Sequence, residues 1–367
     1  MSFKFVTRLV SLCVLVAIFL PGCAREFDPY WKINKFRVLA IKADPVTLRH
    51  NQVTTLTALV HAEEGREISY QWDWCPVMVS AQNDYQCPFT SEDIAALLGE
   101  APEDAEIPAG IDPTLLDFDL GDGPTARLQN PFPAPMILGF CQAIRQQIAD
   151  AAEGSELEGL LPQLDCERGY DITVRLIARS GGEEIIAVKR FTLYTGAEQI
   201  NINPRQDALQ IRPAKEIDAP EIAQRVTWLD ASAPHDDQWH TLPEDEPTPF
   251  VLGIPLQVRA LVDGESVETW RPPAPRGDDR DFLDPRSEVL TYRWFATAGT
   301  FRRSRLLFVD GENTLEEASQ TTFTLDSSRA DTECTVMDGE CRVKIWNVVR
   351  DGRLGLDWIE RELVAVE

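Results

Sequence analysis

Short segments rich in β-branched and aromatic residues recur in the same order in both halves of this chain. This repetition constrains the fold more than any other feature. The matched segments are 54–60 with 255–262, 68–73 with 290–295, and 172–181 with 342–352. Segment 172–181 is followed by 185–193, and segment 342–352 is followed by the similar 358–366. Alternation of apolar and polar residues is typical of half-buried β-strands. The repeated order indicates an internal duplication, and chance similarity is the alternative because strands share a small set of residue types.

The first half carries the clearest local signals. Three segments rich in strand-forming residues predict strands at 36–41, 53–60 and 67–74. Two further segments, 169–180 and 184–195, flank Gly181-Gly182, and adjacent glycines favour the tight turn of a β-hairpin. The sequence therefore predicts a mainly β fold.

The stretch between Cys75 and Cys166 has a different character. Ser91 and the residues after it are typical of a capped helix, and 136–153 has apolar residues at helical spacing. A loop rich in Pro, Gly and Asp separates the two segments. We interpret 75–166 as a part-helical insertion in a β-domain.

The first residues carry an export pattern. Lys4 and Arg8 precede an apolar run at 9–20, which is too short to span a bilayer and is typical of a signal peptide. The run ends at Leu20-Pro21-Gly22-Cys23, which resembles the lipobox of bacterial lipoproteins. That resemblance implies cleavage after residue 22 and a lipid on Cys23. An ordinary secretory signal is the alternative.

The charge balance excludes some classes of partner. The chain has 35 Lys and Arg against 60 Asp and Glu, and removing residues 1–22 changes its net charge from −25 to −27. A charge of that sign opposes binding to nucleic acid and direct adsorption to anionic lipid. It suits a body held near a membrane by its own lipid anchor. Ala24 is not the Asp that retains some lipoproteins at the inner membrane, so we expect the outer membrane.

Six cysteines remain after the signal-peptide Cys13 and Cys23 are set aside. An even number in an exported chain predicts disulfides, although spacing alone leaves 15 possible pairings. Their grouping in sequence favours the local pairs Cys75–Cys87, Cys141–Cys166 and Cys334–Cys341.

Tyr70-Gln-Trp72 and Tyr292-Arg-Trp294 lie on the third strand of each predicted set. Several short strands, this Tyr-x-Trp and a closing hairpin resemble the immunoglobulin-like sandwich, in which a Trp packs between two sheets. Tyr170 suggests the tyrosine corner of that family, at an altered spacing. The resemblance implies two tandem immunoglobulin-like domains at 35–198 and 199–367, after a signal peptide at 1–22 and a tether at 23–34. Together with the lipobox, it is similar to surface lipoproteins of Gram-negative bacteria.

Metal and cofactor signals are weak. The segment 277–284 concentrates Asp278, Asp279, Asp281 and Asp284, and flexible acidic loops of this kind can supply oxygen ligands to calcium. The loop 116–123 and the pair His235 and His240 are weaker candidates. A solvated acidic loop is the alternative, and the sequence predicts no required cofactor.

Trp270 and Arg271 begin a Pro-rich stretch, and exposed Trp and Arg are typical of binding hot spots. The alternative is a stiff spacer with Trp270 folded onto its own domain. No nucleophile, metalloprotease or phosphate-loop motif occurs. We therefore expect a non-catalytic, lipid-anchored protein that binds other envelope or surface proteins. A carbohydrate binder is one alternative, and a hydrolase with paired carboxylates in the 75–166 insertion, as in glycosidases, is another.

Overall fold

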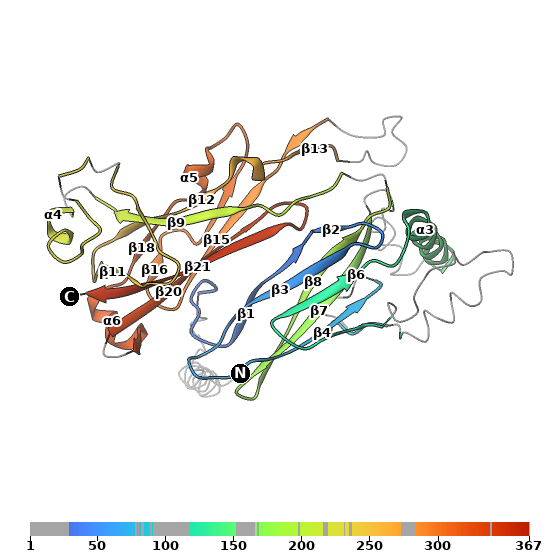
Figure 1. The fold of residues 1–367 in the computed structure, drawn as a ribbon, viewed down its shortest axis with the longest axis horizontal. Helices are drawn as coiled ribbons and strands as arrows, with labels where there is room; N and C mark the ends of the chain where they lie inside the picture. The colour runs from blue at the N-terminus through green and yellow to red at the C-terminus, as the bar shows by residue number, and fades with distance from the viewer. Residues whose placement is uncertain are drawn as a thin grey trace, which may run out of the picture. The chain divides into compact units, whose positions relative to one another are not determined.

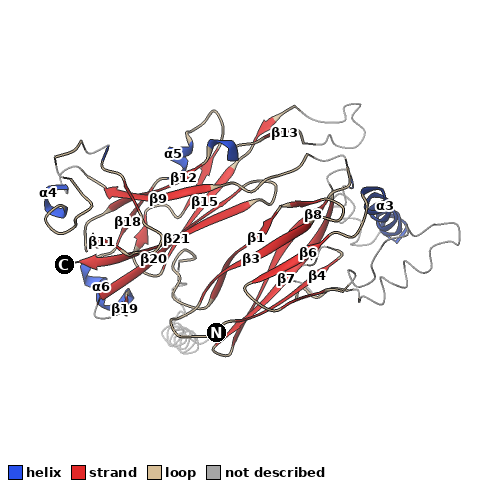
Figure 2. Cartoon of the chain, in the orientation of Figure 1, coloured by secondary structure: helices blue, strands red, loops and turns tan. Residues whose placement is uncertain are grey.

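The chain is mainly β. The computed structural model describes residues 29–77, 79, 81, 84–88, 90, 117–151, 166, 169–196, 199–215, 219–230, 232–234, 237–272, 284–337 and 340–366. Strands make up 47% of the structure and helices 11%, so the mainly β prediction is confirmed (Figure 2). The described residues from Trp31 onward belong to one compact unit. Among the described residues, no helix combines the length and apolar character that a membrane crossing needs.

Strands of the first half form two sheets (Figure 1). One sheet has the order β1-β3-β6 and the other the order β2-β8-β7-β4-β5. Their bounds are β1 Arg37–Asp44, β2 Thr47–Leu48, β3 Val53–His61, β4 Ser69–Cys75, β5 Asp119–Gly121, β6 Thr125–Gln129, β7 Tyr170–Ser180 and β8 Glu183–Leu193. The predicted β7–β8 hairpin is confirmed, and Gly181 and Gly182 both have the positive φ (57° and 86°) that its two-residue turn requires.

Strands of the second half form two further sheets. Their orders are β10-β9-β12-β18-β16 and β11-β21-β20-β15-β17, with β19 pairing β20, and a separate ribbon joins β13 to β14. The bounds are β9 Gln206–Pro213, β10 His240–Thr241, β11 Thr248–Val251, β12 Leu256–Val262, β13 Thr269–Trp270, β14 Arg286–Ser287, β15 Leu290–Ala296, β16 Thr300–Phe301, β17 Arg305–Phe308, β18 Thr321–Thr324, β19 Thr335–Met337, β20 Glu340–Arg350 and β21 Leu356–Val366.

The two halves repeat the same strand connections. The order β1-β3-β6 recurs as β9-β12-β18, and β2-β8-β7-β4-β5 recurs as β11-β21-β20-β15-β17. The short strands β2 and β11 even pair in parallel with equivalent partners, β8 and β21. This shared order supports the duplication inferred from the sequence.

Each half has its own apolar core. Trp72 is fully buried in the first and Trp294 in the second, at 0% and 1% exposure. The two tryptophans lie on β4 and β15, which occupy equivalent places in the repeated strand order. The expectation that both belong to cores is confirmed by their burial.

Among the described residues, one long helix and several short ones occur. Their bounds are α3 Ala134–Ala151, α4 Ala219–Ile222, α5 Leu315–Ser319 and α6 Ser327–Glu333, and a 3₁₀ turn lies at Gly264–Ser266. The helix predicted at 136–153 is present as α3, whereas the one predicted from Ser91 lies outside the described residues. α3 packs Ile137 and Phe140 against the core of the first half.

Three disulfides are present, and they join Cys75 to Cys87, Cys141 to Cys166 and Cys334 to Cys341. These are the local pairs that the grouping of the cysteines favours. Cys141 lies on α3, so its disulfide ties the helix to the chain just before β7. Cys334 follows α6 directly and its partner lies on β20.

Candidate functional site

Apolar and polar contacts from both β-halves meet in one region of the described residues, which we call the seam. Its apolar part is a cluster from both halves: Ile33, Leu39, Ala40, Leu59, Phe295, Trp346, Val348 and Leu356. His61 of β3 also packs edge-on against Trp346 of β20, with ring centroids 5.4 Å apart. Burial of apolar surface on both sides holds the halves together within this compact unit.

The last residues of the expected tether also contribute to the seam. Ile33 N donates to Ala296 O at 2.8 Å, and Ala296 N donates to Trp31 O at 3.1 Å. Lys32 forms an ion pair of 2.9 Å with Glu333. The chain is therefore attached to the second half before it enters β1 of the first.

The segment that connects the halves is pinned by two asparagines. Asn201 Nδ2 donates to Asp351 Oδ2 at 2.9 Å and to Arg353 O at 3.0 Å. Asn203 Nδ2 donates to Ala43 O at 2.8 Å, and its Oδ1 accepts from Leu356 N at 2.9 Å. This connecting segment is thus hydrogen-bonded to both halves.

The β20–β21 turn, residues 351–355, organises the polar side of the seam. An Asp-Gly pair such as Asp351-Gly352 favours a tight two-residue turn, yet this hairpin closes through a wider one. The turn has five residues, and Leu354, rather than Gly352, has the positive φ of 80°. Asp351 Oδ1 accepts from Arg353 N at 2.8 Å and from Gly355 N at 2.7 Å. A Cβ at residue 355 would collide with the Asp351 carboxylate, so glycine is required there.

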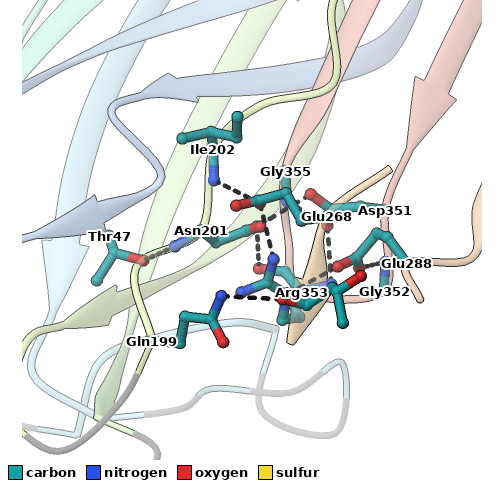
Figure 3. Close-up of polar contacts among 11 residues, drawn as sticks. Thr47, Gln199, Asn201, Ile202, Glu268, Glu288, Asp351, Gly352, Arg353 and Gly355 are labelled. Atoms are coloured by element: carbon teal, nitrogen blue, oxygen red, sulfur yellow. Dashed lines mark hydrogen bonds and ion pairs between the residues drawn. The ribbon is translucent and has the colours of Figure 1, made fainter. Parts of the chain in front are cut away.

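Arg353 reaches from this turn to two glutamates, Glu268 and Glu288 (Figure 3). We call these three residues together with Trp270 the Arg353 cluster. Arg353 Nη2 donates to Glu268 at 2.7 Å, and Nε donates to Glu288 at 2.9 Å. The guanidinium also lies over the Trp270 ring, 5.3 Å from its centroid. The cluster therefore joins the β20–β21 turn to the β13–β14 ribbon, with Glu268 and Glu288 side by side at one end of the ribbon.

The two glutamates also accept backbone hydrogen bonds. Glu288 accepts from Gly352 N at 2.9 Å, and Glu268 accepts from Ile202 N at 3.1 Å (Figure 3). Burial raises the pKa of Glu288, and the neighbouring Arg353 opposes that shift. A buried carboxylate of this kind depends on its cation for compensation.

The predicted partner-binding residues have different environments. Trp270 is half-buried beneath Arg353, which matches the alternative in which it folds onto its own domain. Arg271 is exposed. A role for either residue in partner binding stays a prediction.

The predicted metal loop is largely beyond the described residues. Asp278, Asp279 and Asp281 lie outside them, as do His235 and Cys23, while Asp284 is exposed. Within the described ranges, no three His, Cys, Asp or Glu side chains are close enough together to hold a metal ion. In the weaker acidic loop, Asp119 Oδ1 accepts from Gly121 N at 2.8 Å, so this carboxylate stabilises its own turn.

Two pockets open along the seam. Sequence reasoning missed both pockets, because each combines residues far apart in the chain. The Trp358 pocket has a volume of about 380 Å³ and is lined by Lys42, Asp44, Thr55, Thr57, Asp357 and Trp358. The Lys189 pocket has a volume of about 330 Å³, and its polar lining includes Lys189, Arg190, Arg350 and Asp351.

The chain matches no protein-family model and no curated protein.

Proposed function

We propose that this chain is a lipid-anchored, non-catalytic cell-envelope protein that binds other envelope or surface proteins through two β-bodies held in a fixed arrangement. The observation that carries the proposal is the seam. Eight buried apolar residues and a pinned connecting segment hold the halves together, so loops from both can present one continuous surface. Rigid scaffolds with variable loops are typical of binding proteins.

Each half is proposed to be an immunoglobulin-like sandwich. The repeated strand order supports this, and so does the buried Trp on the third long strand of each half, β4 and β15. The buried hydroxyl of Tyr170 donates to Pro76 O, 94 residues away in sequence, whereas a tyrosine corner bonds to the backbone a few residues upstream, so Tyr170 does not add to this support. Architecture of this kind does not specify a ligand.

The carboxylates that the structure brings together favour a structural role over hydrolysis. Glu268 and Glu288 share one guanidinium and accept backbone N–H groups, so their oxygens are engaged. A glycosidase needs one protonated and one free carboxyl facing the substrate. The pair expected in the 75–166 insertion falls mostly outside the described residues.

Carbohydrate binding is a second candidate, favoured by the Trp358 pocket. A half-buried Trp358 lies there with the hydroxyls of Thr55 and Thr57 and the carboxylate of Asp44. An aromatic face and several hydrogen-bonding groups suit a sugar ring. If the protein binds sugar here, Trp358→Ala should abolish retention on glycan arrays that the parent chain shows.

Membrane fractionation tests the anchor. Cys23→Ser should release the protein from membranes or leave it unprocessed, whereas Cys13→Ser, a matched change inside the apolar run, should change neither. Processing and membrane association of Cys23→Ser like the parent would contradict the lipid anchor. Protease treatment of intact cells then shows whether the body faces outward.

Cross-linking on cells tests the binding role. A partner captured by the parent chain should be lost or weakened when Arg271 and Trp270 are replaced by Ala or when the insertion is deleted. Capture unchanged by both alterations would oppose the proposed surface. A hydrolase activity that disappears with one carboxyl pair would replace the proposal with the enzyme alternative.

A further inference from the structure

The Lys189 pocket gathers positive charge from both halves of the protein. Lys189 and Arg190 come from β8, and Arg350 comes from the end of β20. The Lys189 ammonium donates to Leu354 O in the β20–β21 turn, and Arg350 Nη2 donates to Leu39 O at 3.3 Å. An ammonium has three N–H donors and a guanidinium has five, so each cation keeps donors for another partner.

These cations have few carboxylates beside them among the described residues, with Asp351 acting on Lys189 through its charge alone. Among the described residues, no carboxylate forms an ion pair with Lys189, Arg190 or Arg350, although the chain has 60 acidic and 35 basic residues. The acid in the pocket lining, Asp351, accepts hydrogen bonds from Asn201, Arg353 N and Gly355 N and thereby holds its own turn. The pocket is therefore a basic site on an acidic protein.

The edge of β8 adds to the character of the site. β2 pairs with β8 only at Thr192 and Leu193, so within the described strands the edge beside Lys189 and Arg190 has no strand partner. Unpaired backbone N–H groups at a strand edge can donate to an anion.

We propose that the Lys189 pocket binds an oxyanion, the phosphate, sulfate or carboxylate group of a small ligand, between Lys189, Arg190 and Arg350. Guanidinium groups suit such anions because their paired donors match two oxygens at once. The volume of about 330 Å³ exceeds that of a single ion and leaves room for the body of the ligand. Because the cations come from both halves, the bound anion would also join them across the seam.

The protonation of Lys189 supports this assignment. Burial lowers the pKa of Lys189 to about 8, with Arg350 lowering it and Asp351 raising it. A bound anion would favour the charged ammonium, so binding should be strongest below about pH 8. The other charged residues that line the pocket are Arg190, Arg350 and Asp351.

Calorimetry on the full chain in detergent tests the site, with sulfate as the probe because sulfate does not titrate in this range. We expect saturable binding at about pH 7 that weakens about tenfold or more in Lys189→Met, Arg190→Gln and Arg350→Gln, since each loses a charged hydrogen bond. Arg303→Gln, the same loss of one charge at an exposed residue outside the pocket, should bind like the parent. Arg190 is exposed, so its variant should fold even if Lys189→Met does not.

Two further arms complete the experiment. Raising the pH from about 7 to about 9.5 should weaken sulfate binding several-fold in the parent and leave Lys189→Met unaffected. Methyl phosphate and succinate, compared at equal ionic strength, distinguish a phosphate ligand from a carboxylate ligand. The proposal is overturned if sulfate does not bind saturably, or if Arg190→Gln and Arg350→Gln bind it no more weakly than Arg303→Gln.

Discussion

Arg353 Nε donates a hydrogen bond of 2.9 Å to the carboxylate of Glu288, a residue only 2% exposed. The pair connects the β20–β21 turn to the chain just before β15, because Glu288 lies two residues before the start of that strand. The same turn holds the connecting segment through Asn201 and contributes Leu354 to the Lys189 pocket. One turn therefore organises the second half, the junction and the proposed anion site.

Replacing Arg353 with Met should destabilise the protein by about 3–5 kcal/mol, because it leaves the buried Glu288 carboxylate without its cation. Urea unfolding followed by tryptophan fluorescence measures this loss. Arg303→Met, at an exposed arginine, is the matched control and should cost less than about 0.5 kcal/mol.

The same variant should show a distinct pH dependence. Burial already raises the pKa of Glu288, and loss of the guanidinium removes the group that opposes this shift. A raised folded-state pKa gives stability below the ordinary value that is lost as the pH rises through the folded value. The destabilisation by Arg353→Met should therefore be smaller at acidic than at neutral pH. Equal destabilisation at both would show that Glu288 is not the group left uncompensated.

The two core tryptophans allow a comparison between halves. Either Trp72→Ala or Trp294→Ala should cost about 3–5 kcal/mol, as for other large buried aromatics. The Phe variants should differ, because Trp72 Nε1 donates to Gly123 O at 2.8 Å while Trp294 Nε1 is buried without a hydrogen-bond partner among the described residues. We expect Trp72→Phe to cost about 1 kcal/mol more than Trp294→Phe. Equal losses in urea melts would contradict this.

The sequence predicted what local pattern determines. Alternation identified the strands β4, β7 and β8, and Gly181-Gly182 identified the turn between β7 and β8. Both signals are local, because side-chain period and turn chemistry act over a few residues. The burial of Trp72 and Trp294 followed from the same alternation. The grouping of the cysteines in sequence favoured the local pairs that the structure contains.

The contacts of the seam could not be predicted from the sequence, for a physical reason. Arg353 meets Glu268 across 85 residues and Glu288 across 65, and Lys189 meets Leu354 across 165. No local pattern identifies such partners, because charged residues are common and their contacts depend on how the two halves pack. The 351–355 turn shows the same limit at short range, since Asp351-Gly352 suggested a tight turn and the Asp351 carboxylate instead closes a wider one.

The disulfides should contribute unequally to stability. Cys141–Cys166 spans 25 residues of sequence and Cys334–Cys341 spans 7, and a longer loop loses more entropy in the unfolded chain when it is closed. We expect the double Ser variant of the 141–166 pair to lose about 1 kcal/mol more than that of the 334–341 pair. Urea melts of the two variants give the comparison. A larger loss for the 334–341 pair would show that loop length does not govern these bridges.

Lys189 should make the stability of the protein rise with pH in a defined window. Its folded pKa of about 8 lies below the ordinary value of 10.5, so between these values the unfolded chain binds the proton more strongly. Unfolding free energy then increases with pH, by up to about 3 kcal/mol over the window, relative to Lys189→Met. The measurement is the difference between urea melts of the two proteins at about pH 7.5 and about pH 10.5, in buffer free of sulfate and phosphate. Lys215→Met, at an exposed lysine, should retain the profile of the parent. If the difference between parent and Lys189→Met does not change with pH, the ammonium is not desolvated in the pocket.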